Sequence, residues 1–231
     1  MRILITGASR GLGLELVELA AAGGNEAIAC ARDLSSLPER MTARAADRPG
    51  RIRWERLDVT LEEEAAALAK RLREESLELD AIVNNAGVLL AREHRIGTLP
   101  LDEVRRTFEV NLFGPMAVMK HFAPLLAEGA TVVNVSSEAG SFAGAYGGDY
   151  PYALSKAALN YFSKQLGEEL RGRGVRVLAV HPGWIRTDMG GTHAPLEAAD
   201  SARGVWSLLE RRTNVPEDVV FVNHLGEPMP L

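Results

Sequence analysis

Seven short apolar runs alternate with longer amphipathic stretches along this chain of 231 residues. The runs are rich in β-branched residues and span 2–6, 26–31, 52–57, 79–84, 130–136, 175–180 and 218–223. The amphipathic stretches span 13–22, 62–75, 101–126, 152–171 and 196–212. Strands that alternate with helices build a mostly parallel sheet, because each helix packs back onto one of its faces. We therefore predict an α/β fold, a Rossmann-type doubly wound parallel sheet of about seven strands with helices on both faces.

The chain contains no repeat, low-complexity segment or linker that would divide it. A chain of this length can bury a sizeable core within one domain, so we expect a single domain over residues 1–231. Ligands of doubly wound sheets bind outside the carboxyl ends of the strands. We expect residues 1–100 to form mainly the dinucleotide-binding half and residues 101–231 the catalytic and substrate-binding half.

Composition and charge argue against several classes of function. The formal net charge of −5 argues against nucleic acid as a partner. The five histidines are scattered and Cys30 is the only cysteine, so the sequence predicts no metal site. No stretch reaches the roughly eighteen apolar residues of a membrane span, and the first apolar run is too short for a signal peptide. We expect a protein of the reducing cytoplasm that binds no membrane.

A glycine-rich segment, TGASRGLG, follows the first predicted strand. Gly7, Gly11 and Gly13 let the backbone turn tightly and approach a phosphate, and the next helix offers free N–H groups and the positive end of its dipole. The spacing is G-x-x-x-G-x-G, not the common G-x-G-x-x-G, so an ordinary strand-to-helix turn is the alternative. We predict that the loop binds cofactor phosphates through Gly7, Ser9, Arg10, Gly11, Leu12 and Gly13.

The second predicted strand ends in CARD, where dinucleotide folds meet the adenosine ribose. An acidic side chain there bonds the 2′-hydroxyl of NAD, whereas an arginine pairs with the 2′-phosphate of NADP. Arg32 comes first in this chain, and Arg10 can supply a second guanidinium. The sequence therefore favours NADP(H). The alternative is that both arginines are solvated surface charges and that Asp33 binds the ribose of NAD.

Tyr152 stands four residues ahead of Lys156 in YPYALSK. On a helix both side chains lie on one face, so the ammonium would stabilise the phenolate. Lowering the pKa of a phenol from about 10 to about 7 takes roughly 4 kcal/mol, which a charge about 4 Å away supplies at an effective dielectric of about 20. We predict that Tyr152 is an acid–base residue whose pKa is lowered by Lys156. A chance pair on a solvated face is the alternative.

Seven motifs occur in one order along the chain. They are TGASRGLG, LDVT at 57–60, NNAG at 84–87, Asn111 in FEVNLFG, VVNVSS at 132–137, Tyr152-x-x-x-Lys156 and the PG of HPGWIRTDMGG at 181–191. In order and spacing they resemble the short-chain dehydrogenases/reductases over essentially the whole chain. Within that family, GGDYPYALSKAALN and HPGWIRTDMGG are similar to the sniffer-type carbonyl reductases and the bacterial C-factor group.

The resemblance implies a role for each matching position. The catalytic set would be Asn111, Ser137, Tyr152 and Lys156. Ser137 would bond the substrate carbonyl oxygen, and Asn111 would hold a water that links Lys156 to solvent. Lys156 would also bind the nicotinamide ribose, and Thr187 the carboxamide. The other implied cofactor residues are Asp58, Val59, Asn84, Ala86, Gly87, Pro182, Gly183, Trp184 and Ile185.

Structural roles remain open for several of these residues. Asp58 could close a strand end beside an N-cap threonine, and Ser136 could satisfy backbone groups at a strand end. Asn111 could instead form hydrogen bonds between helices.

The resemblance implies carbonyl reduction: NADPH delivers hydride to the carbon of an aldehyde or ketone while Tyr152 gives a proton to its oxygen. Two alternatives are an NAD-dependent alcohol dehydrogenase and a C-factor-like signalling protein with little turnover. The substrate loops correspond to 88–98, 138–150 and 184–205, whose apolar content predicts a small to medium, largely apolar carbonyl compound. A homodimer or homotetramer is also implied, paired through the helices of 101–127 and 152–171.

Overall fold

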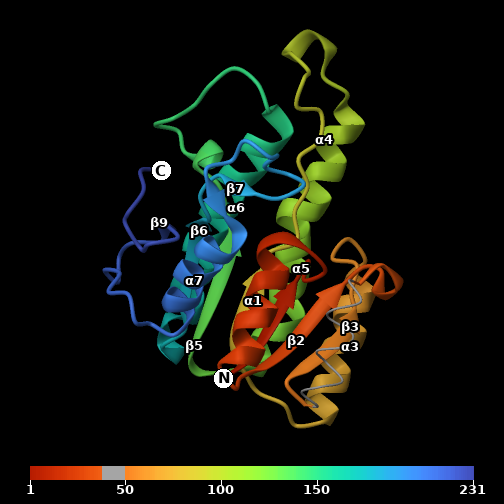
Figure 1. The fold of residues 1–231 in the computed structure, drawn as a ribbon, viewed down its shortest axis with the longest axis vertical. Coiled ribbons are helices and arrows are strands. Elements are labelled where there is room, and N and C mark those ends of the chain that lie inside the picture. The colour runs from red at the N-terminus through yellow and green to blue at the C-terminus, as the bar shows by residue number, and fades with distance from the viewer. Residues whose placement is uncertain (38–49) are drawn as a thin grey trace.

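The computed structural model describes residues 1–37 and 50–231, and a seven-stranded sheet forms its centre (Figure 1). The strand order is β3-β2-β1-β4-β5-β6-β9, and all neighbouring strands are parallel. The strands are β1 (Arg2–Thr6), β2 (Glu26–Ala31), β3 (Ile52–Arg56), β4 (Leu79–Asn84), β5 (Leu126–Val135), β6 (Arg176–His181) and β9 (Phe221–Asn223). The predicted α/β fold with a doubly wound parallel sheet is confirmed.

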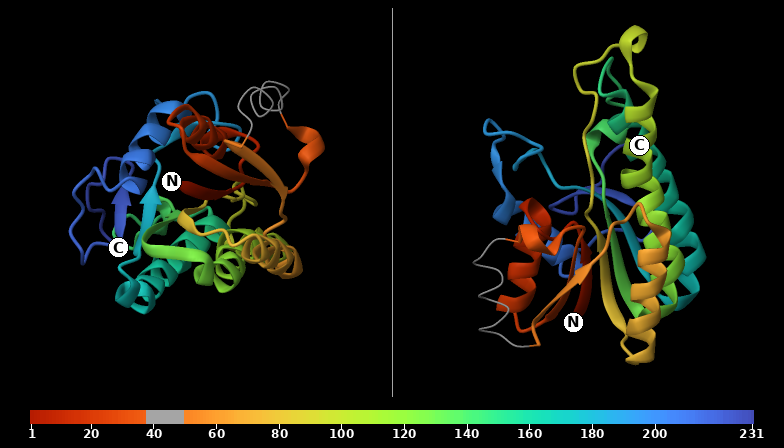
Figure 2. Two further views of the ribbon diagram at one scale, coloured as in Figure 1. Left: turned by 90° about the horizontal axis from the view of Figure 1, so that it is seen from below. Right: turned by 90° about the vertical axis from the view of Figure 1, so that its right-hand side faces the viewer.

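Helices cover both faces of this sheet (Figure 2, right). One face carries α1 (Gly11–Ala22) and α7 (Ala198–Leu209). The other face carries α3 (Glu62–Glu74), α5 (Gly114–Phe122) and α6 (Tyr150–Leu170).

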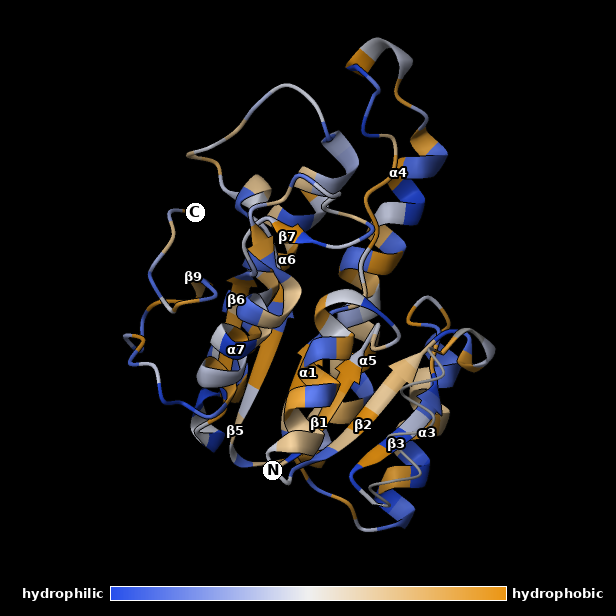
Figure 3. Ribbon diagram, in the orientation of Figure 1, coloured by the Kyte–Doolittle hydropathy of each residue, from blue (hydrophilic) through white to orange (hydrophobic). Residues whose placement is uncertain are grey.

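The central strands consist mostly of hydrophobic residues, as their orange colour in Figure 3 shows. Ile3 and Ile5 pack with α1 and α7, whereas Leu4 between them packs with α3 and α5. This alternation follows from the two-residue period of a strand. It explains why the strands appear in the sequence as nearly continuous apolar runs.

Two predicted strands differ from the structure by more than a residue at one end. The last strand is shorter than the run 218–223, because the N–H of Val219 donates to the carbonyl of Pro216 in a turn and pairing begins only at Phe221. The strand predicted at 130–136 begins earlier, at Leu126, where it pairs with Leu79 before a register shift.

The helix predicted over 101–126 is interrupted. α4 (Leu101–Phe108) leads into a π-helical turn, Glu109–Phe113, which precedes α5. Pro115 contributes to the irregularity, because it has no N–H to donate to the carbonyl of Asn111 four residues earlier. Single π-turns within helices occur frequently at functional sites.

Candidate functional site

A cavity of about 1610 Å³ opens at the carboxyl ends of the strands, next to the reversal of strand order between β1 and β4. This is the position at which open α/β sheets bind ligands. Most of the predicted site residues line it: Gly7, Ser9, Arg10, Gly11, Leu12, Arg32, Asp58, Val59, Ala86, Gly87, Ser137, Tyr152, Lys156, Pro182, Gly183, Trp184, Ile185 and Thr187. Gly13, Asn84 and Asn111 are not among the lining residues.

The glycine loop has no room for a side chain at Gly7 or Gly13. Gly7 has a φ of +63°, and a Cβ on it would lie 2.8 Å from the Cα of Ala86. A Cβ on Gly13 would lie 2.5 Å from the carbonyl oxygen of Gly7. Gly13 therefore lets α1 pack against the loop and is not among the residues that line the cavity, so its predicted part in cofactor binding stays a prediction.

The first turn of α1 is suited to an anion. No side chain caps its N-terminus, and none of its first residues is acidic. Gly11 and Leu12 of this turn line the cavity. The first N–H groups of a helix have no acceptor within the helix, so they are suited to bind an anion there. Thr187 lies against this turn, because a Cβ on Gly11 would be 3.2 Å from the Thr187 methyl carbon.

Arg32 and Asp33 differ in how they are engaged. Asp33 accepts hydrogen bonds from the backbone N–H of Ser35 (2.8 Å) and from its hydroxyl (2.7 Å), and these bonds lower the pKa of Asp33. Arg32 is exposed at the cavity wall. Arg10 also faces the cavity and forms an exposed ion pair with Asp188 (3.0 Å).

The two asparagines of NNAG have different places. Asn84 is buried, and its Nδ2 donates to Oδ1 of Asn134 on β5 (2.7 Å), so it does not line the cavity as predicted. Asn85, which the sequence analysis missed, does line it and donates to the carbonyls of Thr6 and Gly7 (3.0 Å each). The physical reason is the strand period: Asn84 is the last residue of β4 and faces the core. Asn85 holds the glycine loop in place.

Lys156 lies at the base of the cavity. Its Nζ donates to the carbonyl of Val135 (2.7 Å) and lies 5.5 Å from the centre of the Tyr152 ring. Burial lowers the pKa of Lys156 to about 8. A Cβ on Gly87 would be 3.8 Å from this Nζ, so Gly87 lies directly beside the ammonium.

The pKa of Tyr152 differs from the expectation. Burial raises it above the ordinary value, and an interaction with the Ser137 hydroxyl acts in the opposite direction. Lys156 does not lower it as predicted, because its ammonium lies over the ring and bonds the Val135 carbonyl instead of the phenol oxygen. Among the protein's own groups, Ser137 is thus the main one that favours the phenolate.

The serine pair at the end of β5 divides its roles. Ser136 donates to Oδ1 of Asn160 in the core (2.5 Å), whereas Ser137 accepts from the N–H of Ala139 (3.2 Å) and interacts with Tyr152. A Cβ on Gly140 would lie 2.6 Å from the carbonyl carbon of Lys156. This close packing against α6 sets the position of Ser137 relative to Tyr152.

The side chain of Asn111 is fully engaged behind the cavity. Its Oδ1 accepts from the N–H of Val88 (2.8 Å), and its Nδ2 donates to the Val88 carbonyl (3.0 Å) and the Ser155 hydroxyl (3.0 Å). The side chain thus connects the π-turn to the loop after β4 and to α6, and the predicted water-binding role of Asn111 stays a prediction. The main-chain carbonyl of Asn111 lacks the N–H donor that an α-helix places four residues later, because residue 115 is proline.

The substrate end of the cavity is more polar than predicted. Arg92, Tyr146, Asp149 and His181 line it. Arg92, Tyr146 and Asp149 lie within the predicted substrate loops 88–98 and 138–150, but none of the four was singled out as a site residue. Burial lowers the pKa of His181, whose Nδ1 accepts from the N–H of Glu138 (3.2 Å). His181 and Asp149 lie within the motifs HPGWIRTDMGG and GGDYPYALSKAALN, whereas no motif contains Arg92 or Tyr146.

No group of acidic, histidine and cysteine side chains within residues 1–37 and 50–231 is arranged to hold a metal ion. In the same ranges, no helix combines the length and apolar character needed to cross a membrane.

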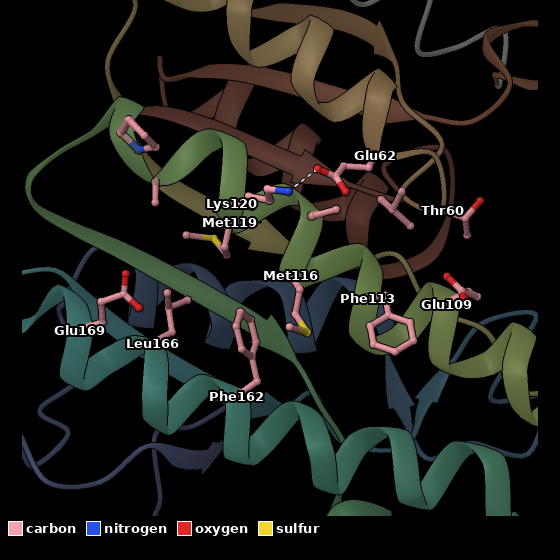
Figure 4. A pocket seen from close by; sticks show the side chains of 14 residues that line it. Thr60, Glu62, Glu109, Phe113, Met116, Met119, Lys120, Phe162, Leu166 and Glu169 are labelled. Carbon is pink, nitrogen blue, oxygen red and sulfur yellow. Dashed lines mark hydrogen bonds and ion pairs between the residues drawn. The ribbon is translucent and has the colours of Figure 1, made fainter.

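A second hollow, of about 800 Å³, lies between α5 and α6 (Figure 4). Met116 and Phe162 face it from the two helices, and Phe113 lies at one end. Glu62 and Lys120 form an ion pair at its rim (2.7 Å). The hollow belongs to the face for which the sequence predicts pairing between copies.

Comparison with known proteins extends this description. A family model described as short chain dehydrogenase matches residues 1–197. The chain is 34% identical over 217 residues to 1-hydroxy-2-glutathionyl-2-methyl-3-butene dehydrogenase of Rhodococcus sp. (strain AD45), with 91% of each chain covered. It is 39% identical over 155 residues to C-signal of Myxococcus xanthus, which covers 66% of this chain and 92% of that protein.

Solved structures agree over the whole chain. The carbonyl reductase Sniffer of D. melanogaster superimposes with a TM-score of 0.89 at 27% identity, covering 100% of this chain and 99% of its own. The NADPH-bound carbonyl reductase from chicken fatty liver gives 0.86 at 29% identity, covering 100% and 98%. The resemblance stated from the motifs is therefore confirmed: the chain belongs to the short-chain dehydrogenase family of oxidoreductases.

Proposed function

We propose that this protein is an NADP(H)-dependent carbonyl reductase of the cytoplasm that acts on a small-molecule aldehyde or ketone. One observation carries the proposal: Ser137, Tyr152 and Lys156 line the same cavity as the glycine loop and Arg32. A hydride donor held by the loop and a proton donor from α6 would then meet at one substrate carbonyl. The buried, unpaired Cys30 fits a reducing compartment.

NADP(H) fits the residues present at the nucleotide end. The glycine loop and the uncapped first turn of α1 suit its phosphates. Arg32 and Arg10 offer guanidinium groups to the 2′-phosphate, whereas Asp33 already accepts two hydrogen bonds from Ser35. The chicken carbonyl reductase holds NADPH. When bound, NADPH supplies the hydride that the carbonyl carbon accepts.

Tyr152 would donate its phenolic proton to the carbonyl oxygen as the hydride reaches the carbon, which leaves an alcohol and the oxidised cofactor. Its raised pKa keeps it protonated at neutral pH, as a proton donor must be. The Ser137 hydroxyl would bond the same oxygen and stabilise its developing charge. Lys156 would hold the nicotinamide ribose.

Proton resupply would follow a path behind the cavity. The Asn111 carbonyl, to which Pro115 cannot donate, would hold a water that links Lys156 to solvent. Asn111 and Lys156 are neighbours across Gly87, since a Cβ on Gly87 would be 3.5 Å from Asn111 Oδ1 and 3.8 Å from Lys156 Nζ. A proton lost from Tyr152 could then be replaced from solvent through that water and the ammonium.

The similarity to C-signal supports a second candidate, a cofactor-binding regulatory protein with little turnover. The combined presence of Ser137, Tyr152 and Lys156 at one cavity favours the reductase, since a protein that only binds the cofactor has no chemical need for a proton donor.

The test is a binding titration with NADPH and NADH, followed by turnover with a panel of aldehydes, ketones and quinones. We expect tighter binding of NADPH and oxidation of NADPH by at least one carbonyl compound. Tight NADPH binding without turnover across the panel would favour the regulatory protein. Tighter binding of NADH, with oxidation of alcohols, would favour an NAD-dependent alcohol dehydrogenase.

A further inference from the structure

Two charged side chains of opposite sign meet at the substrate end of the cavity. Asp149 immediately precedes α6, and Arg92 lies in the loop after β4. Arg92 Nε is 3.9 Å from Asp149 Oδ1, which is an ion-pair distance but too long for a hydrogen bond. The pair therefore leaves both charges able to act on other groups in the cavity.

Asp149 is held in place from the other side. Its Oδ2 accepts a hydrogen bond from the Tyr146 hydroxyl (2.8 Å), and its side chain is only 15% exposed. Oδ1 is buried and has no hydrogen-bond partner within the described part of the chain. A carboxylate so poorly solvated exerts its charge over a longer range than one in water.

The backbone near both residues takes a left-handed conformation that side chains other than glycine seldom adopt. Asp149 itself has a φ of 45°, and Ala91, directly before Arg92, has a φ of 55°. Such conformations persist where the surrounding structure determines them, and they cluster at functional sites. The loops hold these two charges at defined positions, although the residues are far apart in the sequence.

Asp149 caps the N-terminus of α6 three residues before Tyr152, and its carbonyl accepts from the N–H of Ala153, the residue after Tyr152 (2.9 Å). Asp149, Arg92 and Tyr152 all line the same cavity. We propose that Asp149 and Arg92 are positioning residues with opposite effects: Asp149 strengthens the hold of Tyr152 on its proton, and Arg92 weakens it. This role rests on the proposed function, in which Tyr152 is the proton donor.

The directions of the pKa shifts agree with this geometry. Burial is the main cause that raises the pKa of Tyr152, and the Ser137 hydroxyl opposes it. Of the charged groups, Asp149 raises the pKa of Tyr152 and Arg92 lowers it. The other titratable or charged groups that face this end of the cavity come from its neighbouring elements and are Tyr146, Glu138, Lys156 and His181.

The test is the pH dependence of kcat/KM for carbonyl reduction, whose fall at alkaline pH reports loss of the proton from Tyr152. We expect Asp149→Asn to move this fall to lower pH and Arg92→Met to move it to higher pH. Asparagine tolerates the left-handed conformation, so the first variant keeps the backbone. Arg92 has 55% of its side chain exposed, so its replacement does not threaten folding.

Two control variants separate charge from structure. Glu138→Gln removes another carboxylate of the same cavity, one that does not shift the pKa of Tyr152. We expect the alkaline fall, or alkaline limb, of its kcat/KM profile to match that of the wild type. Tyr146→Phe removes the hydrogen bond to Asp149 but keeps the charge, so its limb should not move to lower pH.

A second readout does not depend on turnover. The ultraviolet absorbance of tyrosinate, taken as wild type minus Tyr152→Phe, titrates this phenol directly and should move in the same two directions. Equal limbs in wild type, Asp149→Asn and Arg92→Met, or shifts of the same sign, would overturn the inference. A wild-type protein without carbonyl turnover would instead contradict the proposed function, while the absorbance titration would still test the charge pair.

Discussion

Lys156 illustrates how one buried side chain can serve chemistry at the expense of stability. Its ammonium is held by a single carbonyl, that of Val135, and burial lowers its pKa from 10.5 to about 8. The charged form is therefore less stable in the folded protein than in the unfolded chain. In the proposed function, this cost accompanies the role of Lys156 at the nicotinamide ribose.

The folding stability of a Lys156→Met variant follows from this pKa. The unfolded chain binds more protons between about pH 8 and 10.5, so the wild type gains stability as pH rises through that window. Below it the full penalty of roughly 3 kcal/mol applies, offset by about 1 kcal/mol from the hydrogen bond. We expect the variant to be about 2 kcal/mol more stable at neutral pH.

Urea unfolding at neutral and alkaline pH measures this difference. The advantage of Lys156→Met should shrink as pH rises, whereas the exposed Lys70→Met control should show no such trend. A variant less stable than the wild type at neutral pH would contradict the burial penalty.

Arg32 carries the prediction for cofactor choice. Loss of a charge-assisted hydrogen bond costs about 1.5–3 kcal/mol, so Arg32→Ala should weaken NADPH binding roughly 10- to 100-fold and leave NADH binding nearly unchanged. Fluorescence titration with both cofactors measures the two affinities. Arg105→Ala, an exposed arginine on α4, is the control and should change neither. Equal losses for NADPH and NADH would show that Arg32 does not read the 2′-phosphate.

At the scale of elements, the π-turn between α4 and α5 determines where Asn111 lies. It follows from the local chain and places the Asn111 side chain against Val88 and Ser155. Pro115 has no N–H, so the Asn111 carbonyl lacks the donor that an α-helix places four residues later. The turn thus joins two helices and also offers an acceptor behind the cavity.

Replacing Pro115 tests this element. Pro115→Ala supplies the missing N–H, so the Asn111 carbonyl becomes bonded and the proposed water path is lost. We expect kcat to fall about tenfold, equivalent to about 1.4 kcal/mol, with NADPH affinity unchanged. Steady-state kinetics and a binding titration check this, with Pro124→Ala beyond the end of α5 as the control. An unchanged kcat would place the proton path elsewhere.

What could be predicted from the sequence depends on how local the determining physics is. The apolar runs identify the strands because burial on both faces leaves little choice of residue. Asn84 and Asn85 show the limit, since one step along a strand decides which of them faces the cavity. Arg92 and Asp149 could not be paired, because loops bring them together. The effect of Lys156 on the pKa of Tyr152 depends on where the ammonium lies, and the four-residue spacing of the two side chains does not determine that position.

At the scale of the whole molecule, the hollow between α5 and α6 is a face that a second copy could cover. Phe113 and Met116 are 47% and 41% exposed there, which is unusual for large apolar side chains grouped around one depression. We propose that the protein pairs through this face as a homodimer or homotetramer.

Light scattering tests the pairing. For the wild type we expect a mass of two or four times 25.0 kDa. For Met116→Glu we expect 25.0 kDa, because a carboxylate buried in an apolar interface is strongly unfavourable. Leu101→Glu, at an exposed site at the start of α4, should leave the mass unchanged. A wild-type mass of 25.0 kDa would contradict the proposal.

The proposed function depends on one event, transfer of a proton from Tyr152 to a carbonyl beside a bound dinucleotide. Its most direct test is Tyr152→Phe, which removes one oxygen and keeps the ring that packs under Lys156. We predict that this variant binds NADPH with nearly the wild-type affinity and reduces carbonyl compounds at least about 100-fold more slowly. Carbonyl reduction at the wild-type rate by Tyr152→Phe would contradict the assignment of Tyr152 as the proton donor.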